Sequence, residues 1–263
     1  MGFLGDFRYH SPLMDLGAGM TGLFLLDVID VARALGFEPR QATAEQVADW
    51  LLSKYSKKPR GGFNYHPAMN CLFDLFSGRS NEKSAVQYCL TTGNPKGRRQ
   101  NADAVKCVAA YALEHESRCY PVAFTALAVG RVKQQTVYVS MKAPLVRVEH
   151  GVASVVMPGF RMSYRPMEPE IDVACSIALA NLARDDYEGA GFEYLYAGPG
   201  MNGQREFRAI DGRSRKIYDR DEVDSLVDIY VKGVALALER GAVAKKPDLR
   251  TYRIIDPDQP HLF

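Results

Sequence analysis

The sequence has few of the patterns that mark a metal site, a secreted protein or a membrane span. Its five cysteines are scattered over 263 residues and none forms a Cys-x-x-Cys pair, which argues against a zinc ribbon and a disulfide framework. An odd number of cysteines, scattered along the chain, is typical of reduced thiols. The most apolar stretch, residues 20–37, contains Asp27, Asp30 and Arg33, which are costly inside a bilayer. We therefore expect a cytoplasmic protein of prokaryotic type, with no membrane contact, secretory signal, metal or cofactor.

Catalytic fingerprints are equally scarce. The chain has no Gly-x-Ser-x-Gly elbow and no Gly-Lys-Ser/Thr phosphate loop. Residues 17–22 match the Gly-x-Gly-x-x-Gly string, but no apolar strand leads into them. His115 and Cys119 would form a nucleophile pair only on one continuous helix, and Pro121 predicts that the helix ends before it. Whether the chain is an enzyme is left open by these patterns.

The hydrophobic residues, 47% of the chain, are sufficient for a buried core, and their spacing changes along the sequence. Helical spacing gives way to strand-like alternation near residues 118–135. The pattern predicts an α+β protein with an N-terminal helical lobe over 1–130. A mixed lobe with antiparallel hairpins and two packed helices is expected over 131–263. Helices are predicted over 23–35, 43–55, 66–76, 84–90, 101–115, 171–183 and 219–240, and strands over 137–139, 145–148, 152–157, 192–197, 205–210 and 251–255.

The net charge of +2 hides a strong segregation of charge along the chain. Residues 1–52 carry a net charge of −4, whereas residues 53–106 carry +7. The near-neutral total excludes a histone-like polycation. The localised basic block is nevertheless typical of a protein with a polyanionic partner.

Two segments of this block have the residue types of a nucleic-acid site. Residues 57–66 mix cations, glycines and aromatic rings, which in single-strand binders hold phosphates and stack on bases. Residues 93–101 place cations just before a predicted helix, whose first N–H groups attract phosphate. The predicted phosphate- or nucleic-acid-binding residues are Lys57, Lys58, Arg60, Phe63, Tyr65, Lys96, Arg98 and Arg99. Solvated helix ends and polar loops explain the same cations without a ligand.

The favoured hypothesis is a nucleic-acid-binding or nucleoprotein-assembly protein without catalysis of its own, with RNA and DNA both open. One alternative is a metal-dependent nuclease, or an enzyme on a phosphorylated substrate, with Asp186, Glu193 and Glu206 as ligands. Another is a structural subunit that binds a protein partner or forms a homo-oligomer. A second basic cluster over 205–216 extends the binding surface or, as favoured here, pairs with acids at 219–224.

Overall fold

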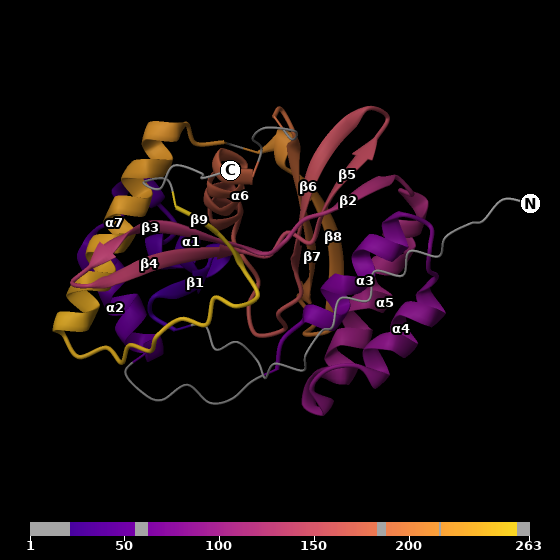
Figure 1. The fold of residues 1–263 in the computed structure, drawn as a ribbon, viewed down its shortest axis with the longest axis horizontal. Coiled ribbons are helices and arrows are strands. Elements are labelled where there is room, and N and C mark those ends of the chain that lie inside the picture. The colour runs from indigo at the N-terminus through magenta and orange to yellow at the C-terminus, as the bar shows by residue number, and fades with distance from the viewer. Residues whose placement is uncertain (1–21, 56–62, 183–187, 216, 257–263) are drawn as a thin grey trace, which may run out of the picture.

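The computed structural model describes residues 22–55, 63–182, 188–215 and 217–256, and these form an α+β fold of helices and two mixed sheets, which confirms the predicted class (Figure 1). The helices are α1 (Val28–Leu35), α2 (Ala44–Tyr55), α3 (His66–Phe76), α4 (Glu82–Thr91), α5 (Arg98–Glu114), α6 (Glu168–Leu182) and α7 (Arg220–Glu239). The strands are β1 (Leu25–Asp27), β2 (Arg118–Pro121), β3 (Thr125–Val132), β4 (Gln135–Met141), β5 (Leu145–Glu149), β6 (Val152–Gly159), β7 (Gly191–Pro199), β8 (Arg205–Asp211) and β9 (Arg253–Ile255).

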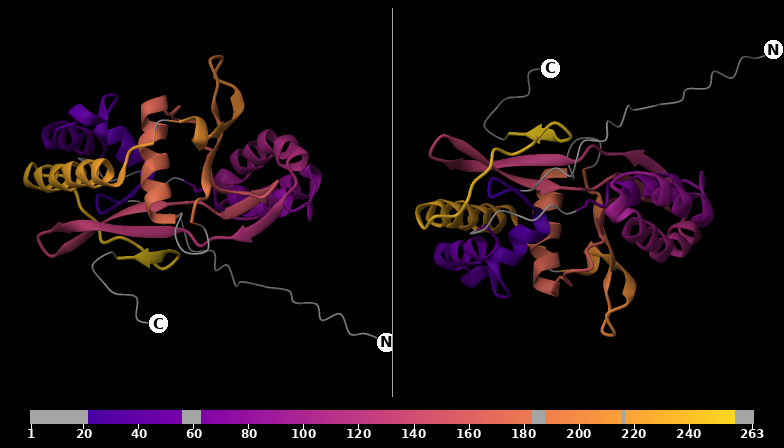
Figure 2. Two further views of the ribbon diagram at one scale, coloured as in Figure 1. Left: turned by 90° about the horizontal axis from the view of Figure 1, so that it is seen from above. Right: turned by 90° about the horizontal axis from the view of Figure 1, so that it is seen from below.

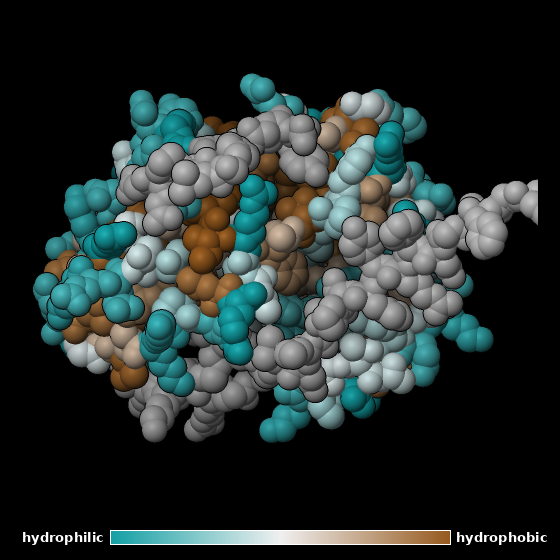
Figure 3. All heavy atoms as spheres, in the orientation of Figure 1, coloured by the Kyte–Doolittle hydropathy of each residue, from teal (hydrophilic) through white to brown (hydrophobic). Residues whose placement is uncertain are grey.

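Sheet A has the strand order β1-β4-β3-β9. Its centre is the antiparallel pair β3–β4, and the short edge strands β1 and β9 run parallel to their neighbours. Helices α1, α2 and α7 pack with this sheet around one large hydrophobic cluster. On the face drawn in Figure 3, hydrophobic residues are visible mainly near the middle of the molecule, and hydrophilic residues surround them.

Sheet B has the order β2-β5-β6-β7-β8, and only the β6–β7 pair is parallel. It lies between α6 on one side and helices α3–α5 on the other, as the two views of Figure 2 show. Successive side chains of a strand point to opposite faces. Accordingly Tyr194 and Tyr196 of β7 join the first hydrophobic cluster, whereas Leu195 and Ala197 join the cluster of α3–α5. The strand is therefore buried on both faces.

Local sequence signals account for several element boundaries. Thr43 and Gln46 form the predicted reciprocal cap of α2, with Gln46 N donating to Thr43 Oγ1 at 3.3 Å. Asp219 and Glu222 form a second such capping box at α7. The predicted hairpins over 145–157 and around the 198–203 loop are both present.

The helix predicted over 23–35 is only partly correct. Residues 25–27 instead form β1, and the helix α1 starts at Val28 after Asp27, whose Oδ1 accepts from Ile29 N at 3.2 Å. A short apolar run fits a buried strand and a buried helix equally well, so periodicity alone did not locate this boundary. The correction places Asp27 at the end of a strand.

The packing of the described residues does not follow the order of the chain. Helix α2 packs against α7, and α1 against α6, although about a hundred residues or more separate each pair in sequence. Strand β3 itself runs across residue 130. The division into lobes at 1–130 and 131–263 stays a prediction. Among the described residues no helix is both long and apolar enough to cross a membrane.

Candidate functional site

The two segments predicted to bind a polyanion are neighbours in the fold, joined by Asn101. The Asn101 side chain is buried in the first turn of α5. Its Nδ2 donates to the carbonyl oxygens of Asn64 and Gly97, both at 2.9 Å, and its Oδ1 accepts from Ala68 N at 3.0 Å. One side chain thus connects residues 63–66 to the loop that precedes α5.

The aromatic residues Phe63 and Tyr65 are half-buried at this junction. Their ring centroids are 5.2 Å apart in an edge-to-face arrangement, and Tyr65 makes a second such contact with Phe160 at 6.0 Å. Phe63 also lies so close to Gly97 that a Cβ at this glycine would overlap the ring. The two rings therefore have defined positions and retain some solvent exposure.

The predicted cations of the second segment lie beside these rings in sequence and structure. Lys96 and Arg99 are exposed, and Arg98 is half-buried with its Nε donating to Gly93 O at 3.3 Å. Within the described residues none of the three forms an ion pair. The other predicted cations, Lys57, Lys58 and Arg60, lie outside the described residues. We call Phe63, Tyr65, Lys96, Arg98 and Arg99 the basic aromatic face.

A cavity of about 550 Å³ opens next to this face. Three of its charged lining residues lie at the ends of strands. Asp27 ends β1, Lys142 follows β4, and Arg161 follows β6. Strands β1 and β4 are parallel, so their carboxyl ends meet at one edge of sheet A, where Asp27 pairs in register with Ser140. The cavity volume falls in the range of small-molecule sites, about 300–1,000 Å³.

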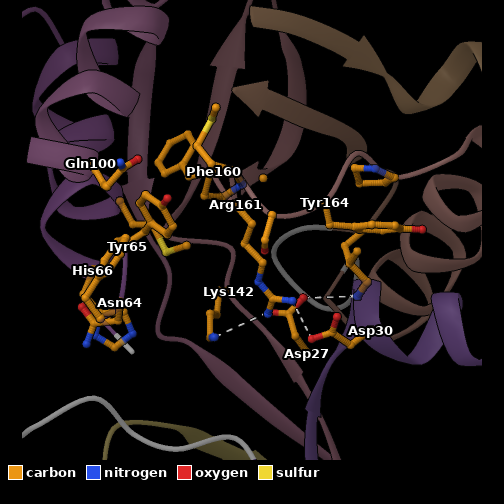
Figure 4. Close-up of a pocket in the computed structure, with 18 of the residues that line it drawn as sticks. Asp27, Asp30, Asn64, Tyr65, His66, Gln100, Lys142, Phe160, Arg161 and Tyr164 are labelled. Atoms are coloured by element: carbon orange, nitrogen blue, oxygen red, sulfur yellow. Dashed lines mark hydrogen bonds and ion pairs between the residues drawn. The ribbon is translucent and has the colours of Figure 1, made fainter. Parts of the chain in front are cut away.

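Four charged side chains line one side of the cavity and compensate one another (Figure 4). Arg161 Nη1 donates to Asp30 Oδ2 at 2.6 Å, and Arg161 Nη2 lies 3.8 Å from Asp27 Oδ2. Lys142 Nζ lies 3.5 Å from the same Asp27 oxygen. Burial favours a higher pKa for Asp27, but the charges of Arg161 and Lys142 outweigh it and hold this pKa below its ordinary value.

Two amide side chains line the opposite side, near Tyr65 (Figure 4). Gln100 Oε1 accepts from Arg205 Nη2 at 3.2 Å, and Asn64 Oδ1 accepts from His66 N at 3.2 Å. A guanidinium and a backbone N–H can only donate, so these bonds fix which way both amides point. The NH₂ groups of Asn64 and Gln100 have no hydrogen-bond partner among the described residues.

His66 is a neutral group at physiological pH in this setting. Burial, with a smaller effect from the nearby Lys142 charge, lowers the pKa of His66 from its ordinary 6.5 to about 4. Its ring lies against Phe124, with centroids 5.1 Å apart. The imidazole therefore adds no charge to the cavity.

Tyr164 forms a further wall of the cavity, and both its hydroxyl group and its ring have interaction partners. Its hydroxyl donates to Glu170, and the Arg33 guanidinium lies 3.5 Å from the ring centroid. Burial and the hydrogen bond to Glu170 raise the pKa of Tyr164 well above its ordinary value, so the phenol stays protonated.

The second basic cluster is used within the protein. Arg205 Nη1 donates to Phe160 O at 2.9 Å and to Ala197 O, and its guanidinium lies 5.9 Å from the ring centroid of Tyr65. Arg213 pairs with Asp211. Arg215 pairs with Glu168 and Asp172 at 2.7 Å each. The expected partners at residues 219–224 are therefore wrong for Arg213 and Arg215.

The acids considered for a nuclease are not brought together where the structure describes them. Both Glu193 oxygens accept from Arg147, at 2.7 and 3.0 Å, and Tyr111 donates to the same carboxylate. On β8, Glu206 lies opposite Gly198, five positions along β7 from Glu193. Asp186 lies outside the described residues. In the described part of the chain no three His, Cys, Asp or Glu side chains are grouped as a metal site.

Comparison with known proteins adds no relationship. No family model, curated protein or solved structure matches this chain. The site therefore has to be interpreted from its own chemistry.

The sequence did not indicate the cavity residues Asp27, Lys142 and Arg161. Each follows or ends a strand of a mixed sheet, and polar residues at strand ends are a general signal for a site. The pattern of residues 23–35 predicts one helix, which places Asp27 inside it and hides the strand end. Arg161 follows the predicted strand 152–157, but no local pattern pairs it with Asp27 and Asp30, which lie more than a hundred residues earlier.

Proposed function

We propose that this protein binds single-stranded nucleic acid through the basic aromatic face and catalyses no reaction of its own. The observation that carries the proposal is Asn101, whose side chain connects residues 63–66 to the loop before α5, the two segments that the sequence predicts to bind a polyanion. The face thereby combines exposed cations with half-buried rings, the combination that single-strand binders use for phosphates and bases.

The electrostatics of the face support a polyanionic ligand. Residues 63–106 carry six cations and three acids. Lys96 and Arg99 are exposed and form no ion pair with the described residues, unlike Arg213 and Arg215, which are paired within the protein. Unpaired cations keep their long-range field and release counterions when phosphates bind.

The setting of this function is part of the same proposal. Five free cysteines fit a reducing compartment, and we place the protein in the cytoplasm of a prokaryote, where RNA or DNA is the partner. A protein partner or a second copy of the chain in a nucleoprotein assembly is compatible with it. A nuclease needs grouped ligands, and Glu193 is held by Arg147, so this alternative has less support.

The test is fluorescence anisotropy of labelled single- and double-stranded oligonucleotides over a salt series. We expect the single strand to bind more tightly. The triple variant Lys96→Ala, Arg98→Ala, Arg99→Ala should bind more weakly and reduce the salt slope by about 2, at about 0.7 per phosphate contact.

The matched control removes three cations from another part of the chain, with the variants Arg131→Ala, Lys245→Ala and Lys246→Ala. These residues are exposed, form no ion pair with the described residues, and change the net charge by the same amount. No binding at low salt, or an equal loss in the two triple variants, would refute the proposal.

A further inference from the structure

We propose that the cavity beside the basic aromatic face binds one nucleobase of the strand, with an exocyclic amino group directed toward Asp30. The inference rests on the proposed function and specifies what part of the ligand each region contacts. Continuity supports it: Phe63 and Tyr65 belong to the face and also line the cavity, and Gln100 lines it next to Arg99.

The walls of the cavity suit a flat ring. Five phenylalanine and tyrosine residues contribute to them: Phe63, Tyr65, Phe160, Tyr164 and Tyr194. Tyr65 and Phe160 contact each other edge to face, and Arg33 covers Tyr164 from one side, so these rings are already ordered. Ordered aromatic walls lose little conformational entropy when a base stacks on them.

The charges that line the cavity favour an uncharged base over a phosphate as its ligand. Its two cations, Lys142 and Arg161, are paired with the carboxylates of Asp27 and Asp30, and His66 is neutral. A phosphate entering the cavity would therefore meet no uncompensated positive charge and would face two carboxylates. Phosphates are better placed on the unpaired Lys96 and Arg99 outside.

The free hydrogen-bonding groups of the cavity indicate which donors and acceptors the bound base presents to the protein. Asp30 Oδ2 accepts from Arg161, whereas Oδ1 has no partner among the described residues and is available as an acceptor. The NH₂ groups of Asn64 and Gln100 are available donors on the other side (Figure 4). Adenine, guanine and cytosine carry an amino donor together with ring acceptors, and thymine and uracil lack the amino group.

The experiment compares three short single strands of equal length by anisotropy: oligodeoxycytidine, oligothymidine and a strand of abasic residues. We expect affinity to fall in that order. Stacking of one base predicts an advantage of about 5- to 150-fold for oligothymidine over the abasic strand. The variant Asp30→Asn replaces an acceptor-only group with one that also donates, so it should reduce the preference for cytosine.

Two further variants guard against effects of misfolding. Gln100→Leu removes one donor from the cavity and should weaken both base-containing strands, whereas Gln87→Leu makes the same change at an exposed site on α4. Asp228→Asn on α7 is the matched control for Asp30→Asn. Thermal melting checks that each variant is folded, and a base-dependent loss in a folded variant cannot come from unfolding.

The outcomes separate this inference from the proposed function. Equal affinity for oligodeoxycytidine and oligothymidine that Asp30→Asn leaves unchanged, with a loss in the Lys96, Arg98 and Arg99 triple variant, overturns the base site and supports the basic aromatic face. Calorimetric binding of free cytidine without binding of any strand overturns the face and supports the base site, provided that Asp30→Asn weakens cytidine binding. Absence of both overturns both.

Discussion

Replacing Asn101 by alanine should separate the two segments that make the basic aromatic face. The N-cap residue of α3, Tyr65, makes no side-chain capping bond, and Asn101 Oδ1 supplies the missing acceptor to Ala68 N from another helix. The same side chain satisfies the carbonyl oxygens of Asn64 and Gly97. Asn101 therefore caps helix α3, although it belongs to α5 and is remote from α3 in sequence.

The magnitude follows from these three bonds. Loss of a helix cap costs about 0.5–2 kcal/mol. Each further hydrogen bond contributes about 0.5–1.5 kcal/mol, and a buried group left without a partner costs about 1–3 kcal/mol. Ala68 and Gly97 are buried, so water does not readily replace the lost bonds. Together these effects predict that Asn101→Ala lowers the free energy of unfolding by about 2–4 kcal/mol.

Urea denaturation followed by circular dichroism measures this change. Asn101→Asp keeps an acceptor for Ala68 N and loses only the donors, so it should lower the free energy of unfolding by less than Asn101→Ala does. The urea series is repeated at several pH values, so that destabilisation by the new negative charge is controlled for. Asn202→Ala is the matched control, because Asn202 is exposed and accepts only from Gln204 N; it should change stability by less than about 0.5 kcal/mol. A loss as small as this for Asn101→Ala would refute the capping role.

Two other predictions concern buried charge. His66 has a pKa of about 4 in the folded protein and about 6.5 when unfolded, so protons bind the unfolded chain more tightly; stability should fall as pH drops from about 6.5 to about 4, by up to about 1 kcal/mol per pH unit. The variant His66→Asn should lack this part of the slope, and identical slopes in urea melts would contradict the assignment. Glu193→Gln should destabilise the protein by about 1–3 kcal/mol, because Arg147 and Tyr111 lose the charged acceptor between them while Glu149 still pairs with Arg147. The double variant Arg147→Met, Glu193→Gln should lose less stability than the two single variants combined, and additive losses would contradict the ion-pair explanation.

The sequence predicted elements best where the signal is local. The capping boxes at Thr43 and Asp219 and the hairpin over 145–157 depend on residues within a few positions of one another, and the structure has all three. Strand β3, in contrast, was not predicted, and its partners include β9, more than a hundred residues later. Pairings over such distances have no local pattern.

The candidate site was predicted in the same uneven way. The residues 63–65 and 96–99 were selected by composition, since cations beside aromatic rings are visible in a short window. Their proximity depends on Asn101, which appeared only as a polar residue at a helix start. The cavity depends on three strand ends, and one of these, at Asp27, was assigned to a helix. Composition thus located candidate residues, whereas contacts between remote segments decided their arrangement.

The cations of the cavity are paired with carboxylates, whereas those of the basic aromatic face are not. This difference argues that the two regions of the site have different roles. At the cavity, Arg161 and Lys142 are each within 4 Å of a carboxylate, so the field they project into solvent is small. On the basic aromatic face, Lys96 and Arg99 have no such partner among the described residues. Attraction of a polyanion therefore depends on the face, and discrimination between bases depends on the fixed donors and acceptors of the cavity. Salt should consequently weaken binding of every strand, while the preference for one base over another changes little with salt, because compensated charges release few counterions.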